Sequence, residues 1–403
     1  MPTGVRVAIV THKLDMGGME RSMLRLYRCL KDNGFVVEFI TTEQRGEWFG
    51  LISKLAPVRH IEFHPLGGLP HIFRVGQVLA GGDYDVVILF NARYAQAALR
   101  MLPDTIAAIP AIRSDTEGFY KVGLGNQSAW NAVVVNSPKL YAVARERLPH
   151  KPVICIPNGV ELPDLSRLAE RRGPDGTARL IFVGRLTRRK GVRCLAPILR
   201  RCLDAGLDSH LNVVGDGPER LGVLSDIKDA GLTARVKLFG SLSPDEVSGM
   251  LLDAHVLILP TQVEGFPNVV LEAQACGCVP VVSRLPGITD MMIDHGETGL
   301  LVDPTDIDGF VSAITNICSD SSKWSRMSKA GHLKVAQNFS FQRECESYST
   351  LIRDVLRGRY PLPGTRKSLW PIETSILSWP DLVPPIVRKI VRWIRASLRL
   401  KGA

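Results

Sequence analysis

The chain has 403 residues, which is more than one hydrophobic core usually holds, so we expect two domains. Apolar residues make up 45% of the chain and charged residues 22%, a composition typical of a soluble globular protein. No apolar run reaches the roughly 18 residues that a membrane span needs. The opening residues, MPTGVRVAIVTH, pass directly into a strand pattern and lack the features of a signal peptide.

The net charge of +10 is concentrated near the end of the chain. Residues 358–403 hold nine Lys or Arg against two acidic residues, a net +7, which leaves only +3 for all the residues before them. Because no basic groove through the body is indicated, we expect no nucleic-acid partner.

The chain contains eight cysteines, none of them in a C-x-x-C motif. In the absence of an export signal, we expect reduced, buried thiols rather than disulfides or a zinc site. The eight are Cys29, Cys155, Cys194, Cys202, Cys276, Cys278, Cys318 and Cys345.

In the first half of the chain, apolar runs alternate with helical patterns. The run VRVAIVTH is typical of a buried parallel strand. A loop with two glycines follows, and the apolar side chains of residues 21–31 have helical spacing that ends at Asn33-Gly34. Further strands are expected at FVVEFIT, DVVILF, IAAIPAI and NAVVVNS.

The same alternation begins again at ARLIFVGR and continues through SHLNVVGDG, RVKLFGS, HVLILPT and VPVVSRL. Two βαβ series predict an α/β protein with two facing, doubly wound, Rossmann-like domains. The ligand is then expected in the cleft between them, outside the carboxyl ends of the strands. The stretch PNGVELPDLSRLAERRGPDGTA between the two series has the composition of a linker.

Two of the loops after predicted strands carry residues suited to phosphate. Gly17-Gly18 lie at a strand-to-helix junction, where a helix N-terminus can bind a phosphate or a sugar, although for a lone Gly-Gly we favour a tight turn. In GRLTRRKG, Arg185 and Lys190 can both reach one diphosphate. The alternative for this loop is a solvated basic surface.

The third such loop precedes a short helix expected at residues 269–277, within EGFPNVVLEAQACGCVP. Glu264 stands before this helix and Glu272 lies about one turn into it. Carboxylates accept hydrogen bonds from vicinal hydroxyls, so the pair can hold opposite ends of one ligand. The alternative is a helix cap at Glu264 and a surface residue at Glu272, but the apolar neighbours of Glu272 favour a buried helix.

Taken together, GGMER, IPNGVE, VGRLTRRKG, VVGDGPER and EGFPNVVLEAQACGCVPVVSRLPGITDMMIDHGETGLLV resemble the GT4 family of retaining glycosyltransferases, over about residues 5–355. The resemblance implies the GT-B fold. It also implies an acceptor domain at 1–160, a linker at 161–177, a nucleotide-sugar domain at 178–340, a helix at 341–357 that returns to the first domain, and a basic tail at 358–403.

The resemblance further implies a role for each motif residue. Arg185 and Lys190 would bind the diphosphate and stabilise the leaving group, Glu264 would hold the donor sugar and Glu272 the ribose. No protein nucleophile is implied, because the leaving phosphate takes the acceptor's proton on the same face. Donor contacts are also implied for Gly17, Gly18, Gly265, Phe266 and Asn268.

Two other short motifs bear on metal and donor. Asp83-Tyr84-Asp85 spells the D-x-D of a different, manganese-binding glycosyltransferase fold, but it precedes a strand, so we expect no metal. The expected co-substrate is a UDP- or GDP-sugar, without a further cofactor. Many relatives carry a sugar-contacting His after a strand in the middle of the first domain, where this chain has Arg113-Ser114-Asp115. Either Arg113 or Asp115 takes that role, or the contact is lost.

The end of the chain has the pattern of a membrane-surface helix. From Ile386 to Lys401, apolar residues fall on one helical face, six Lys or Arg surround it, and no acid occurs up to the C-terminus. The alternatives are a helix packed on the body and a disordered basic end. The family resemblance, which this tail fits, implies a cytoplasmic enzyme, peripheral on the inner membrane face, that transfers a hexose-type sugar to a glycan or lipid-linked acceptor of cell-envelope polysaccharide or lipopolysaccharide type.

The alternatives to this function are a different enzyme of the same fold, a non-catalytic subunit and a dehydrogenase. A phosphorylase or sugar-nucleotide epimerase of the same fold is disfavoured by the combination of Arg185 and Lys190 with Glu264 and Glu272. A catalytically degenerate, membrane-docked partner subunit is supported only by the absent His. A dehydrogenase is excluded because no G-x-G-x-x-G follows the first strand.

Overall fold

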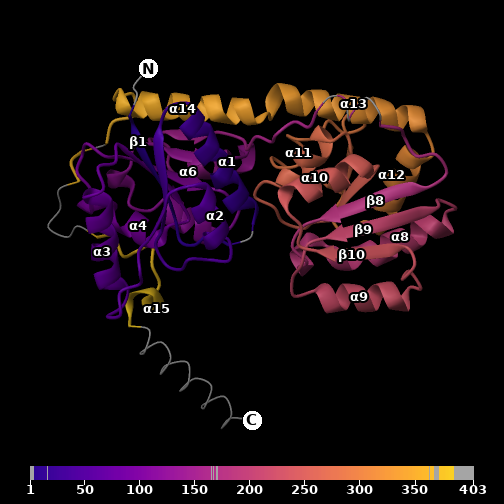
Figure 1. Ribbon diagram of the computed structural model, residues 1–403, viewed down its shortest axis with the longest axis horizontal. Coiled ribbons are helices and arrows are strands. Elements are labelled where there is room, and N and C mark those ends of the chain that lie inside the picture. Colours follow the sequence, from indigo (N-terminus) through magenta and orange to yellow (C-terminus); the bar gives the residue numbers. More distant parts are fainter. Residues whose placement is uncertain are drawn as a thin grey trace, which may run out of the picture. The chain divides into compact units, whose positions relative to one another are not determined.

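A computed structural model describes residues 4–15, 17–164, 166, 168, 171–362, 364–366 and 372–384. The chain forms two compact units (Figure 1). The first contains Met1–Asn136 and Leu140–Ile156 and resumes at Cys345, and the second contains Ser137–Lys139 and Pro157–Glu344.

The first unit is built on a seven-stranded parallel sheet in the order β3-β2-β1-β4-β5-β6-β7. Its central strands are almost wholly buried, as parallel strands are when helices cover both faces. The strands are β1 (Arg6–Thr11), β2 (Val36–Thr41), β3 (Val58–His60), β4 (Val86–Phe90), β5 (Ala107–Ile112), β6 (Val133–Val135) and β7 (Val153–Cys155). The helices along this part of the chain are α1 (Gly18–Asp32), α2 (Phe49–Leu55), α3 (Gly68–Ala80), α4 (Arg93–Ala98), α5 (Glu117–Gly123) and α6 (Pro138–Arg147).

The second unit is built on a six-stranded parallel sheet in the order β10-β9-β8-β11-β12-β13. The strands are β8 (Ala178–Val183), β9 (Ser209–Val214), β10 (Val236–Gly240), β11 (Val256–Leu259), β12 (Val279–Ser283) and β13 (Leu300–Val302). The helices are α8 (Leu195–Asp204), α9 (Arg220–Asp229), α10 (Pro244–Asp253), α11 (Asn268–Ala275), α12 (Ile307–Cys318) and α13 (Ser321–Asn338). Helix α14 (Phe341–Leu356) begins in this unit and continues in the first, to which α15 (Trp379–Leu382) also belongs.

The predicted pair of doubly wound α/β sheets is confirmed, with differences at the ends of elements. Helix α1 begins at Gly18 rather than at residue 21, and α11 spans Asn268–Ala275 rather than residues 269–277. Strands β3, β7 and β13 were not predicted. Each is a three-residue strand at the edge of its sheet and is partly exposed, so no run of buried apolar residues marks it.

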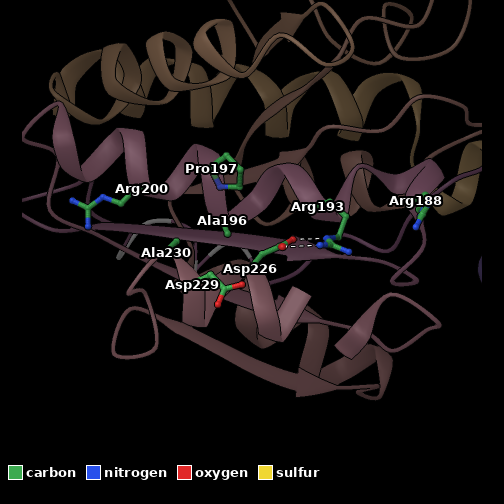
Figure 2. Close-up of a pocket in the computed structure, with 8 residues that line it drawn as sticks. All are labelled: Arg188, Arg193, Ala196, Pro197, Arg200, Asp226, Asp229 and Ala230. Atoms are coloured by element: carbon green, nitrogen blue, oxygen red, sulfur yellow. Dashed lines mark hydrogen bonds and ion pairs between the residues drawn. The ribbon is translucent and has the colours of Figure 1, made fainter. Parts of the chain in front are cut away.

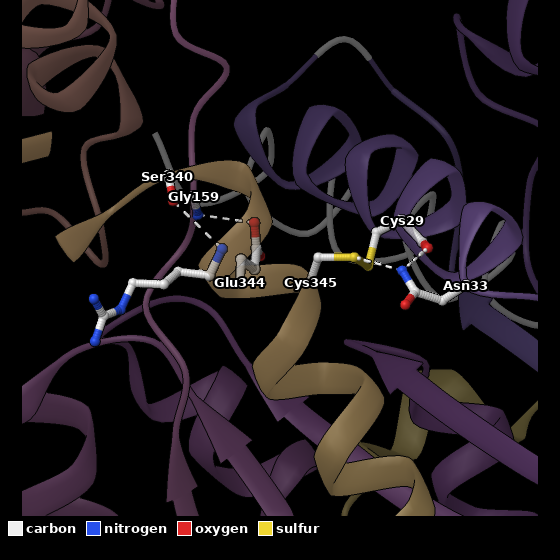
Figure 3. Close-up of a disulfide and its surroundings, with 7 residues drawn as sticks. Cys29, Asn33, Gly159, Ser340, Glu344 and Cys345 are labelled. Atoms are coloured by element: carbon white, nitrogen blue, oxygen red, sulfur yellow. Dashed lines mark hydrogen bonds between the residues drawn. A yellow bond between two sulfur atoms is a disulfide. The ribbon is translucent and has the colours of Figure 1, made fainter. Parts of the chain in front are cut away.

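The expectation that the cysteines are all reduced and buried is wrong. Cys29 of α1 and Cys345 of α14 form a disulfide whose Cα atoms lie 5.4 Å apart, across a sequence separation of 316 residues (Figure 3). Asn33, one turn after Cys29, donates hydrogen bonds to the Cys29 carbonyl at 3.0 Å and to the Cys345 sulfur at 3.2 Å. Among the six free cysteines, Cys155 is exposed and Cys194 is partly exposed. The pairing was missed because two distant helices bring the thiols together.

Candidate functional site

The order of the strands locates the candidate site in the second unit. Strand β8 pairs with β9 on one side and with β11 on the other, so the strand order reverses at β8. In sheets of this kind, ligands bind beyond the carboxyl ends of the strands at the reversal point. The loops that leave β8 and β11 there are residues 184–191 and 260–267, which contain five of the predicted site residues.

The loop after β8 is held in place by backbone contacts. Buried Leu186 donates its N–H to the Asp216 carbonyl at 2.9 Å and accepts from the Glu219 N–H at 3.0 Å. Gly191 has a φ of 67°, in the left-handed region, and a Cβ there would lie only 1.8 Å from the Pro260 carbonyl oxygen. The loop is therefore fixed both to the chain after β9 and to the chain after β11.

Two predicted site residues meet across these loops. The ammonium of Lys190, in a 3-10 turn at Arg188–Lys190, lies 2.5 Å from a carboxylate oxygen of Glu264. The Glu264 side chain is only 8% exposed. The Gln262 N–H and the Thr261 hydroxyl both donate to the Arg189 carbonyl, at 2.8 and 3.1 Å, which keeps the two loops together. A cation and an acceptor thus stand side by side at the reversal point, whereas Arg185 is exposed on the same loop.

Helix α11 adds further donors and acceptors. No side chain caps its N-terminus, which follows Pro267, and the Val270 N–H donates to the Pro267 carbonyl at 2.9 Å. Asn268 accepts a hydrogen bond from the Asn158 side chain at 2.7 Å, a positioning contact that sequence reasoning missed. Glu272 is half-buried one turn into the helix. The other two predicted donor contacts precede the helix: Gly265 is half-buried and Phe266 is buried.

A separate groove of about 660 Å³ runs along α8 and α9 (Figure 2). Three arginines line it, but each has a carboxylate partner in the protein. Arg193 pairs with Asp226 and Glu219, Arg188 with Glu219, and Arg200 with Asp204. Because these charges are balanced, the groove lacks the excess positive charge expected of a diphosphate site.

The glycine loop predicted to close on a donor lies in the first unit, where the strand order reverses between β1 and β4. Gly17 is extended, with a φ of −165°, and precedes α1, whose first residue is Gly18. The carboxylate of buried Glu20 faces Gly17, where a Cβ would lie 2.7 Å from it. Burial raises the pKa of Glu20 to about 7, and burial together with Lys13 lowers the pKa of His12 to about 4.

The two candidates for the sugar contact in the first unit both have protein partners. The buried Arg113 guanidinium donates to the Tyr348 hydroxyl of α14 and lies 5.2 Å from the centre of the Phe90 ring. Asp115 accepts a hydrogen bond from the Tyr120 hydroxyl at 2.9 Å. Burial, reinforced by Asp115, raises the pKa of that hydroxyl.

The D-x-D motif lies at the amino edge of the first sheet. Asp85 accepts the backbone N–H of Arg6 at 2.7 Å and donates its own to the Arg6 carbonyl, which ties the start of β4 to β1. Among the residues that the structure describes, no group of three or more His, Cys, Asp or Glu side chains is arranged to hold a metal ion.

Comparison with solved structures defines the class of protein. HepE from Anabaena in complex with UDP aligns with a TM-score of 0.72 at 18% identity, covering 87% of this chain and 100% of that chain. The lipopolysaccharide outer core galactosyltransferase WaaB, in its apo form, aligns with a TM-score of 0.67 at 19% identity over 87% and 100%. The protein has the GT-B fold.

Sequence comparison then gives the family. The model for glycosyl transferases group 1 matches residues 168–334, and that for the glycosyl transferase 4-like domain matches residues 17–114. Glycogen synthase of Mycobacterium tuberculosis (strain ATCC 25618 / H37Rv) is 28% identical over 52% of this chain, which spans only 51% of that protein. The lipopolysaccharide core biosynthesis glycosyltransferase LpsE of Rhizobium meliloti (strain 1021) is 27% identical over 83% of this chain and 96% of that protein. The chain belongs to the group 1 glycosyltransferases, the family that its motifs resembled.

Proposed function

We propose that the protein is a retaining glycosyltransferase that moves a hexose-type sugar from a UDP- or GDP-sugar to a glycan or lipid-linked acceptor. The observation that carries this proposal is the contact between Lys190 and Glu264 at the reversal point of the second sheet, beside the uncapped start of α11. Solved relatives named as complexes with UDP and with UDP-glucose support the donor class. The names of LpsE and WaaB support an acceptor of lipopolysaccharide type.

The proposed roles of the site residues follow from the negative charge that develops on the leaving group during sugar transfer. Departure of a nucleoside diphosphate places negative charge on phosphate oxygens, and preorganised cations and helix amides stabilise it. In the proposal, Arg185 and Lys190 bind the diphosphate, Glu264 accepts from the sugar hydroxyls, and Glu272 accepts from the ribose. When the diphosphate binds, Lys190 divides its three N–H donors between phosphate and Glu264. The departing phosphate takes the acceptor's proton, so no metal and no protein nucleophile is required.

The domain roles belong to the same proposal. Residues 178–340 bind the donor and residues 1–160 the acceptor, with a linker at 161–177 and a returning helix at 341–357. Gly17 and Gly18 close on the donor. The basic tail within 358–403, from Ile386 to Lys401, holds the enzyme on the anionic inner face of the cytoplasmic membrane; those residues lie outside the described part of the chain. Among the described residues, no helix has the length and apolarity that crossing a bilayer requires.

A second candidate function is a catalytically degenerate partner subunit. It is favoured by one observation: Arg113, which stands where relatives carry a sugar-contacting His, is buried against Tyr348 and Phe90. Such a protein would bind a membrane and a partner without turnover.

A thermal-shift screen of UDP, GDP, ADP and their sugars tests the proposal first. We expect one nucleotide to raise the melting temperature of the wild type, and Arg185→Ala/Lys190→Ala to abolish the shift. Glu272→Ala should weaken nucleotide binding by roughly 10- to 100-fold, because a hydrogen bond to a charged group contributes about 1.5–3 kcal/mol. Glu264→Ala should mainly lower turnover, and EDTA should change neither binding nor turnover.

The control variants are Glu297→Ala and Lys237→Ala, exposed residues of the same unit outside the two site loops. Both should bind nucleotide like the wild type. Equal UDP binding by wild type and Glu272→Ala would refute the ribose assignment. If folded wild type shifts with no nucleotide, the partner-subunit function is favoured instead.

A further inference from the structure

Helix α3 is apolar on its outward face as well as on its inward face. Ile72, Val75 and Leu79 are buried against the sheet, as expected for the inward side of a covering helix. On the other side, Leu69 and Phe73 are each 37% exposed, and Leu66, two residues before the helix, is 67% exposed. We call these three residues the α3 stripe. Exposed apolar side chains gathered in one patch are typical of a surface that meets a partner.

The stripe borders a hollow and carries no negative charge. The hollow, of about 470 Å³, is lined by Leu69, Phe73, His64, Pro70, Arg74 and Gln77. Helix α3 contains no acidic residue. The nearby acid Glu62 pairs with Arg45 at 2.9 Å. The surface around the stripe is therefore neutral to basic.

The described chain ends beside the stripe. A Cβ on Gly68 would lie 1.9 Å from the Asp381 carbonyl oxygen, and one on Gly67 would lie 2.7 Å from the Pro384 nitrogen. Asp381 also pairs with Arg93 at 2.7 Å, and its carbonyl accepts from the Tyr94 hydroxyl at 3.0 Å. This short helix, α15, is thus fastened to the start of α3 (Figure 1). The basic segment from Ile386 onward follows in the sequence and lies outside the described residues.

We propose that the α3 stripe inserts into the interface of an anionic lipid bilayer, the same kind of surface that the sequence of segment 386–401 is suited to bind. The charges of the segment and of α3 favour an anionic membrane as the partner of the stripe. The segment holds six Lys or Arg and no acid, and α3 has no acidic residue with which the segment could pair. Anionic headgroups, in contrast, attract both the segment and Arg74 of α3. Two anchors, apolar and electrostatic, hold a protein on a membrane more firmly than either alone.

The position of the stripe also indicates which class of acceptor the enzyme uses. Because α3 follows β3, its first turns lie at the carboxyl edge of the first sheet, the edge that also carries the loops after β1 and β4. A membrane bound there faces the end of the unit proposed to hold the acceptor. This inference rests on the proposed function, and it narrows the acceptor class to one anchored in the membrane.

The test is flotation of the full chain with vesicles of phosphatidylglycerol and phosphatidylcholine. We expect Leu69→Glu/Phe73→Glu to lower vesicle binding at least tenfold, because the substitutions remove apolar burial and add negative charge. Leu221→Glu, at an 80% exposed position of α9 in the second unit, is the matched control and should bind like the wild type. All the substituted positions are exposed, and equal melting temperatures would show that the variants fold.

Unchanged vesicle binding by the double variant would overturn the proposal, and stronger binding would indicate that the tail covers the stripe instead. If the wild type is a dimer without lipid and the double variant is a monomer, the stripe binds a second copy of the chain instead of a membrane. The nucleotide thermal shift is measured on the same samples. Loss of vesicle binding with an intact shift supports the stripe, whereas absence of any shift in wild type refutes only the donor function.

Discussion

At the scale of single residues, the ionisable groups near the loops of the two sheets differ: those of the second unit form an ion pair, whereas that of the first unit is a buried carboxyl. Lys190 and Glu264 form an ion pair at 2.5 Å across the two site loops. Glu20, beneath the Gly17-Gly18 loop, is buried, and burial alone is the largest influence on its pKa. The first pair is suited to binding a charged ligand, whereas Glu20 makes the first unit sensitive to pH.

The pH dependence of Glu20 can be measured. Its pKa is raised from 4.5 to about 7, so between these values the folded protein holds a proton that the unfolded chain releases. Stability therefore falls as pH rises through this window and stays lower above it. We expect Glu20→Gln to gain stability relative to wild type between pH 4.5 and pH 8, by up to about 3 kcal/mol.

Melting curves of both proteins at pH steps across this range give the difference. The same series for Glu297→Gln, an exposed glutamate, serves as the control and should run parallel to the wild type. A constant difference between wild type and Glu20→Gln at all pH values would contradict the raised pKa.

At the scale of elements, α14 is joined to the first unit by two contacts on one face. Cys345 is bonded to Cys29 of α1, and Tyr348, three residues later, meets Arg113 at the end of β5. In the chain-entropy model, a cross-link over so long a loop restricts the unfolded chain strongly.

We expect Cys29→Ser/Cys345→Ser to lower the free energy of unfolding by about 2–5 kcal/mol under non-reducing conditions. Dithiothreitol should lower the melting temperature of wild type but not that of the double variant. Thiol titration in denaturant should find six free thiols in wild type, as the structure has six free cysteines. Eight titrated thiols, or a wild type indifferent to reductant, would contradict the disulfide. Cys155→Ser, at an exposed free cysteine, is the control.

At the scale of the whole molecule, the charge distribution predicts that donor binding and membrane binding belong to different parts of the chain. The body before residue 358 carries a net +3 and holds both sheets, whereas the last 46 residues carry +7. Donor binding is proposed for the second unit and membrane binding for the tail and the α3 stripe, so the two should be separable.

Deletion of residues 386–403 should leave the nucleotide thermal shift unchanged and lower binding to anionic vesicles at least tenfold, since each cation near such a surface contributes about 1 kcal/mol. Raising the ionic strength should weaken wild-type binding toward that of the deletion, because surface charges are screened. Neutral vesicles are the control. If the deletion lost its nucleotide shift, or kept full vesicle binding, the division of tasks would be wrong.

The sequence by itself determined the class of fold and the loops that carry the candidate site. Strands such as β1 and β8 contain unbroken apolar runs, at residues 7–10 and 180–183, and the loop residues that follow each strand mark the carboxyl edge of its sheet. Both features are local patterns in the chain. The tertiary structure alone decided which distant groups meet. The contacts of Lys190 with Glu264, Asn158 with Asn268, Arg113 with Tyr348 and Cys29 with Cys345 span from 74 to 316 positions. Such pairs depend on strand order and helix packing, which local periodicity does not encode.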